Sequence, residues 1–123
     1  MTTCLVIDDS RVIRKVARRL LEDMGFAVEE AEDGAAALEA CRTAMPDAIL
    51  VDSAMPNMDG VTFMKALRRE AIGALPAIIY CTTENDEPHV VSARAAGAAR
   101  VLMKPFDKET LEASLTGVGV VPH

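Results

Sequence analysis

Short apolar runs alternate along the chain with longer segments in which apolar residues recur every three or four positions. A short apolar run is typical of a buried strand, and the longer spacing is typical of a helix with one buried face. The predicted strands cover residues 5–7, 26–31, 48–51, 77–81 and 100–103. The predicted helices cover residues 12–24, 35–44, 61–71 and 87–96, and a last helix runs from residue 107 or 108 to residue 115. The run 26–31 is the most polar of the strands, which favours a place at an edge of the sheet.

This alternation of strands and helices predicts an α/β fold, in which a doubly wound parallel sheet carries helices on both faces. Crossover connections in such sheets are right-handed, so the strands all end at the same edge. Ligands bind beyond those carboxyl ends, where the order of the strands reverses. We therefore expect residues 1–123 to form a single domain with its functional site at that edge.

The composition narrows the class of protein. The chain has 123 residues and a formal net charge of −6, which argues against nonspecific binding to nucleic acid or to an anionic membrane. No apolar run approaches the roughly 20 residues of a membrane-spanning helix, and no basic segment precedes the first apolar run as in a signal peptide. Three widely spaced cysteines fit neither a disulfide framework nor a metal knuckle. They are Cys4, Cys41 and Cys81, which we expect to be buried in a cytoplasmic protein.

The first predicted helix carries an apolar and a basic set of residues. The apolar residues predicted to form one face are Val12, Ile13, Val16, Leu20 and Met24. The basic residues are Arg14, Lys15, Arg18 and Arg19. A basic face of this kind is either simply solvated or docks onto an acidic partner such as a kinase.

Charged and hydroxyl residues stand where four of the predicted strands end. They are Asp8 and Asp9 after the first strand, Asp52 after the third, Thr82 after the fourth and Lys104 after the fifth. Three carboxylates with a single lysine form a negative pocket, which suits a hard divalent cation such as Mg²⁺. Beside the metal, Asp52 can attack a phosphoryl group, because the metal neutralises charge on the transferring oxygens. Thr82 and Lys104 can then contact two of the phosphoryl oxygens.

These residues resemble the signature of the receiver domain of two-component response regulators, and within that family the stand-alone chemotaxis-type regulators. The signature comprises Asp8-Asp9, Asp52 within VDSAMPNMDG, Thr82 within CTTEND, and Lys104-Pro105-Phe106. The similarity covers about residues 4–115. It implies a flavodoxin-like sheet of five parallel strands in the order 2-1-3-4-5 with five helices. That order follows from the resemblance and not from the sequence pattern, since a chemotaxis receiver is itself a known example of it.

The resemblance also implies which residues bind the metal. Asp9 and Asp52 would ligate Mg²⁺ directly, and the backbone carbonyl of Ala54 would be a third protein ligand. Asp8 would act mostly through water. Asp52 would be the phosphoacceptor as well as a ligand.

Further roles follow around the phosphoryl group. Thr82 would be the switch hydroxyl, and Lys104 would contact the phosphoryl group, with a cis peptide bond before Pro105. Two positions depart from the family pattern. Val101 stands three residues before the lysine, where the family has an aromatic residue, and Thr83 is bulkier than usual. Because valine has few rotamers and little reach, we expect activation to move mainly the loop 82–88 and the start of the fourth helix.

The sequence thus predicts a single-domain response regulator that a histidine kinase phosphorylates on Asp52 with Mg²⁺. It would catalyse only its own phosphorylation and dephosphorylation, and it would be a monomer with no output domain following. The phosphorylated form would bind a protein target through the face of helix four, strand five and helix five. No nucleic acid or membrane partner is expected.

Three alternative functions fit the residues to different degrees. The sequence does not separate direct output from the role of a phosphorelay intermediate or phosphate sink, which passes phosphate to a histidine phosphotransferase. A haloacid-dehalogenase-type phosphohydrolase needs a second acid where Ala54 stands. A flavin-binding module needs a phosphate loop where Asp8 and Asp9 stand. His89 is interpreted as a surface residue with no part in phosphotransfer.

Overall fold

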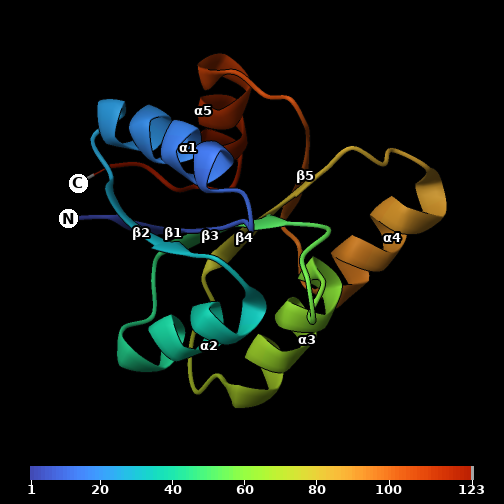
Figure 1. The fold of residues 1–123 in the computed structure, drawn as a ribbon. Helices are drawn as coiled ribbons and strands as arrows, with labels where there is room; N and C mark the ends of the chain where they lie inside the picture. Colours follow the sequence, from blue (N-terminus) through green and yellow to red (C-terminus); the bar gives the residue numbers. More distant parts are fainter. Residues whose placement is uncertain (123) are drawn as a thin grey trace.

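The computed structural model describes residues 1–122, which form a five-stranded parallel sheet between two layers of helices (Figure 1). The strands are β1 (Thr3–Ile7), β2 (Ala27–Ala31), β3 (Ala48–Asp52), β4 (Ala77–Thr82) and β5 (Arg100–Met103). The helices are α1 (Arg11–Asp23), α2 (Gly34–Thr43), α3 (Gly60–Glu70), α4 (Glu87–Ala96) and α5 (Lys108–Gly117). The predicted α/β class and the five alternating strand–helix units are confirmed.

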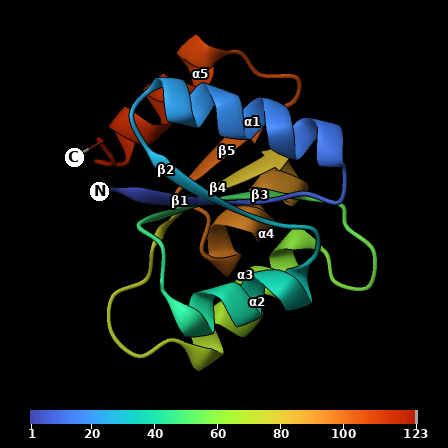
Figure 2. The same cartoon turned by 60° about the vertical axis from the view of Figure 1, so that its left-hand side comes forward.

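The strand order is β2-β1-β3-β4-β5, as the resemblance implied. The direction of winding therefore reverses between β1 and β3. Helices α1 and α5 cover one face of the sheet, and α2, α3 and α4 cover the other (Figure 2). Because all neighbouring strands are parallel, their carboxyl ends meet at one edge.

Two hydrophobic cores lie on the two faces of the sheet, because successive side chains of a strand point to opposite sides. In β1, Cys4 and Val6 belong to the core beneath α1 and α5, whereas Leu5 and Ile7 belong to the core against α2, α3 and α4. The predicted burial of Cys4, Cys41 and Cys81 is confirmed, and all three are free thiols.

A polar cap fixes the start of every helix. The side chain of the cap accepts a hydrogen bond from the backbone N–H three residues later, which satisfies a donor that has no partner within the helix. The caps are Ser10, Asp33, Asp59, Asp86 and Asp107. Each of the five helices follows the carboxyl end of a strand, so the caps also set where the loops at the functional edge end.

The predicted buried face of α1 is partly wrong. Val12, Ile13 and Val16 are 73 %, 37 % and 55 % exposed, whereas Ala17 and Leu21 are buried. Leu20 and Met24 pack at the border of the core, as predicted. The helix turns its small Ala17 toward the sheet, and three apolar side chains are left on its outer surface. No helix within residues 1–122 combines the length and apolarity that crossing a membrane requires.

Candidate functional site

The ends of β1, β3 and β5 bring two carboxylates and one ammonium group together. Lys104 Nζ donates to Asp52 Oδ1 at 2.9 Å and to Asp8 Oδ2 at 3.0 Å. All three side chains are largely removed from solvent, with exposed fractions of 16 % for Lys104, 5 % for Asp8 and 9 % for Asp52. A single lysine therefore bridges two buried acids.

Asp9 adds a third carboxylate on the solvent side. One oxygen each of Asp8, Asp9 and Asp52 lies within 4.8 Å of the others, close enough to bind one cation. Asp9 is exposed, and with Ala54 it lines an open cavity of about 760 Å³. A cluster of carboxylate oxygens beside open space suits Mg²⁺, which retains several water ligands. The donor set thus fits the metal that the sequence predicts.

The site carries more negative than positive charge. Burial raises the pKa of Asp52, and the neighbouring Asp8 and Asp9 raise it further, while the hydrogen bond from Lys104 opposes them. Burial also acts against the charge of Lys104, but its bonds to Asp52 and Asp8 outweigh that effect and raise its pKa. Lys104 is therefore firmly cationic, and Asp52 is held in a site that disfavours its negative charge. A bound cation would relieve that cost.

Thr82 lies at the end of β4 and is fully buried. Its backbone carbonyl accepts from the backbone N–H of Lys104 at 2.9 Å, which ties the ends of β4 and β5 together. Its hydroxyl, however, has partners on the other side: it accepts from the backbone N–H of Glu84 at 3.1 Å and lies 3.4 Å from His89 Nε2. The hydroxyl is thus near the site but engaged with α4.

His89 lies beside the site and not on the open surface that the sequence suggests. Its side chain is only 22 % exposed, its Nδ1 lies 3.2 Å from Glu84, and its ring centroid is 5.5 Å from that of Tyr80. His89 also lines the same cavity as Asp9 and Ala54. The cap at Asp86 fixes where α4 begins and so places His89 over the end of β4. No sequence motif marks this contact.

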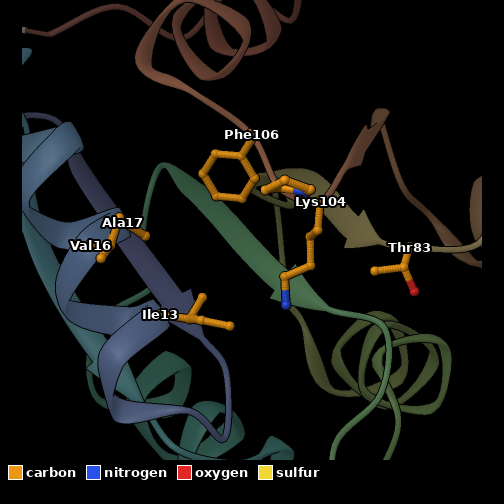
Figure 3. Close-up of a pocket in the computed structure, with 7 residues that line it drawn as sticks. Ile13, Val16, Ala17, Thr83, Lys104 and Phe106 are labelled. Atoms are coloured by element: carbon orange, nitrogen blue, oxygen red, sulfur yellow. The ribbon is translucent and has the colours of Figure 1, made fainter.

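A groove lies between α1 and the segment that follows β5. It has a volume of about 390 Å³ and is lined by Ile13, Val16, Ala17, Thr83, Lys104, Pro105 and Phe106. Figure 3 shows Phe106 and the α1 side chains at this groove, with Lys104 reaching toward the end of β3. The peptide bond before Pro105 is cis, as expected. Two of the exposed apolar residues of α1, Ile13 and Val16, therefore lie beside the lysine of the charged site.

Gly60, the first residue of α3, holds the loop after β3 against the sheet. A Cβ atom at this position would lie 2.7 Å from the Asp52 carbonyl oxygen and 2.8 Å from the Tyr80 ring. Its backbone N–H donates to the Ser53 carbonyl at 3.1 Å. Only glycine permits this close approach, so the backbone beneath Asp52 is tightly confined.

The basic residues of α1 form an internal ion cluster. Arg14, Lys15 and Arg18 contact Glu30 of β2 at 3.2, 2.8 and 2.8 Å. Although burial acts in the opposite direction, hydrogen bonds from Lys15, Arg18 and Arg14 lower the pKa of Glu30 to about 2. Most of the basic face is therefore paired within the molecule.

Comparisons with known proteins agree with this geometry. Residues 4–116 match the response regulator receiver domain family. The chain is 37 % identical over 106 residues to chemotaxis protein CheY of Bacillus subtilis, covering 85 % of this chain and 87 % of that protein. It is also 37 % identical to response regulator MprA of Mycobacterium sp. (strain KMS), but there it spans 90 % of this chain and only 47 % of the relative. The structure of chemotaxis response regulator CheY4 of Vibrio cholerae superposes with a TM-score of 0.90 at 38 % identity, covering 96 % and 98 % of the two chains. The chain belongs to the response regulator receiver domain family and is of the chemotaxis type.

Proposed function

We propose that Asp52 accepts a phosphoryl group from a phosphohistidine of a histidine kinase and that the protein signals through the phosphorylated form. The observation that carries this proposal is the bridge from Lys104 to Asp52 and Asp8, with Asp9 in the same cluster. This arrangement brings the nucleophile Asp52, the cation of Lys104 and further carboxylate oxygens that can bind a metal together at one edge of the sheet. An Asp52 oxygen forms a bond to phosphorus, the P–N bond to the donor histidine breaks, and the imidazole leaves with a proton from solvent.

The residues that would hold Mg²⁺ are Asp9, Asp52 and the Ala54 carbonyl, with Asp8 acting through water. When bound, the metal neutralises charge on the transferring oxygens. Lys104 is placed to pair with a phosphoryl oxygen, because it already lies 2.9 Å from the attacking carboxylate. The Thr82 hydroxyl would donate to another oxygen after leaving its present partner. The chemistry is then positioning and electrostatic stabilisation.

The groove beside α1 supports a docking place for the phosphodonor. Ile13 and Val16, which line one side of the groove, are exposed and apolar, and Phe106 lines the other side. The groove includes Lys104, so a helix seated there would bring its phosphohistidine to Asp52. The basic residues contribute less, because Glu30 already engages three of them. The occupant we propose is the histidine-bearing helix of the kinase.

The output surface would be the face of α4, β5 and α5. Exposed apolar side chains on α4 and β5, Val91 and Met103, support a protein partner there. A role as phosphorelay intermediate, in which phosphate passes on to a histidine phosphotransferase, uses the same Asp52 chemistry. Mixing the labelled phosphorylated protein with such a phosphotransferase distinguishes the relay role from direct output, because only a relay intermediate passes the label on.

Labelled acetyl phosphate with Mg²⁺ tests the acceptor. The wild-type protein should take up label that alkali releases, since acyl phosphates are alkali-labile, and Asp52→Asn should take up none. Asp23→Asn is the matched control, because Asp23 is an exposed carboxylate at the end of α1. Label on Asp52→Asn at the wild-type level would show that another residue is the acceptor.

A further inference from the structure

We infer that His89 is a positioning residue, which competes with the phosphoryl group for the single hydrogen of the Thr82 hydroxyl. The inference rests on the proposed function, because it requires phosphorylation of Asp52. The proposed function names no side chain that stabilises the unphosphorylated state and connects the site to α4, and His89 takes that role here. Nothing in the chain's family signature points to this residue.

The Thr82 hydroxyl has a limited capacity for hydrogen bonds. A threonine hydroxyl has one hydrogen to donate and lone pairs to accept. Here the oxygen accepts from the backbone N–H of Glu84 at 3.1 Å, so the hydrogen is left for an acceptor. The only side-chain partner at hydrogen-bond distance among the described residues is His89 Nε2, at 3.4 Å.

The contact of His89 with Glu84 determines which ring nitrogen carries a hydrogen. Its Nδ1 faces a carboxylate oxygen of Glu84 at 3.2 Å. A carboxylate only accepts, so Nδ1 carries a hydrogen, and in the neutral imidazole Nε2 then presents its lone pair. The network therefore assigns the direction of the bond: the Thr82 O–H donates to His89 Nε2.

Phosphorylation of Asp52 would break the bond between Thr82 and His89. The Thr82 hydroxyl cannot donate to a phosphoryl oxygen and to His89 at once. Its turn toward the phosphoryl group leaves Nε2 without a partner, although His89 stays in contact with the Tyr80 ring, 5.5 Å away between centroids. His89 lies in the first turn of α4, so this loss acts on the start of α4. Strand β5, which carries Val101 rather than an aromatic residue, need not move.

Removing the acceptor should therefore favour the activated state. At about pH 8, His89→Leu should bind beryllofluoride with Mg²⁺ about three- to tenfold more tightly than wild type, because the competing state is weakened. His89→Gln keeps an acceptor near the position of Nε2 and should stay within about twofold of wild type. Ser92→Ala, one turn further along α4, is the matched control and should also stay within about twofold.

A double-mutant cycle separates this role from mere packing. In a Thr82→Val background, which has no hydroxyl, His89→Leu should no longer change beryllofluoride affinity. An affinity gain that persists without the hydroxyl would overturn the inference. So would equal or weaker binding by His89→Leu in the wild-type background.

A spectroscopic readout on the wild-type protein does not depend on any variant at His89. The imidazole ¹⁵N resonances should show Nδ1 protonated, and the Nε2 resonance should shift on loading with beryllofluoride. The sequence holds two histidines, so His123→Gln assigns the signals. An Nε2 resonance that does not move would overturn the inference. If wild type fails to bind beryllofluoride in an Asp52-dependent way, the proposed function itself is wrong, which is a different result.

Discussion

Two ion clusters flank the start of α1, and their charge balance is opposite. The site cluster places two buried carboxylates, Asp8 and Asp52, on one lysine. The Glu30 cluster places one carboxylate among three cations. The pKa of Asp52 is raised, first by burial, whereas that of Glu30 is lowered to about 2 by its cationic partners. In the Glu30 cluster the carboxylate is fully paired with cations, so the cluster stabilises the fold. In the site cluster negative charge is in excess, so a bound cation would stabilise it.

The largest expected effect comes from removing the cation of the site cluster. Lys104→Met should lower the free energy of unfolding by about 3 kcal/mol, because it leaves two buried carboxylates without a cationic partner. Urea unfolding without Mg²⁺ measures this. Adding Asp52→Asn to Lys104→Met should recover a large part of the loss. A single variant as stable as wild type would mean that solvent already screens the site.

The Glu30 cluster should give a smaller and pH-dependent loss. Glu30→Gln should lower the free energy of unfolding by about 1–2 kcal/mol at neutral pH, after allowance for the exposure of Lys15 and Arg18. Because the folded pKa is depressed, the contribution of Glu30 is complete above its unfolded pKa, near 4.5, and is lost as pH falls toward 2. Urea unfolding near pH 7 and near pH 3 should show the gap between variant and wild type closing in acid. A constant gap would assign the effect to packing.

Mg²⁺ should distinguish the two clusters directly. At a concentration ten times its dissociation constant, the metal should stabilise wild type by about 1.4 kcal/mol. Asp9→Ala should lose this gain because it removes a ligand, and Glu30→Gln should retain it. Thermal unfolding with Mg²⁺ and with a chelator measures both. Full stabilisation of Asp9→Ala would place the metal elsewhere.

The smallest expected effect is a gain in stability. Without metal, Asp52→Asn should raise the free energy of unfolding by about 1 kcal/mol or less at neutral pH. The raised pKa means that the ionised Asp52 disfavours folding, so wild type should approach the variant as pH falls and Asp52 is protonated. Paired urea titrations between neutral and mildly acidic pH test this sign. A variant less stable than wild type would show that the bond to Lys104 outweighs burial.

The sequence predicts the elements of this fold well, because apolar runs, caps and glycines are local signals. The sequence of β3 is apolar up to Asp52, where the strand ends. Helix α4 stops at its C-cap, Gly97, as expected. The exposed position of Val12 and Val16 could not be predicted from their spacing. One side of α1 carries these two valines and an overlapping side carries Ala17 and Leu21, and either could have packed against the sheet. The choice depends on how closely Ala17 lets the helix approach. This is a property of packing and not of spacing.

The convergence of the site residues follows from topology, whereas their pairing does not. Parallel strands bring Asp8, Asp52 and Lys104 to one edge whatever their side chains do. The contact of Thr82 with His89, and that of Glu30 with α1, depend on helix placement and rotamers. Neither has a sequence signal, because histidine and glutamate at such positions are usually solvated.

Gly60 makes the floor of the site rigid. The Asp52 carbonyl and the Tyr80 ring leave no room there even for a methyl group, so the backbone beneath the carboxylate cannot retreat when the side chain grows by a phosphoryl group. The added volume must be accommodated outward, into the open space bordered by Asp9, Ala54 and His89. A residue bulkier than glycine at position 60 would displace the backbone beneath Asp52. The phosphoryl group would then be accommodated in a different direction.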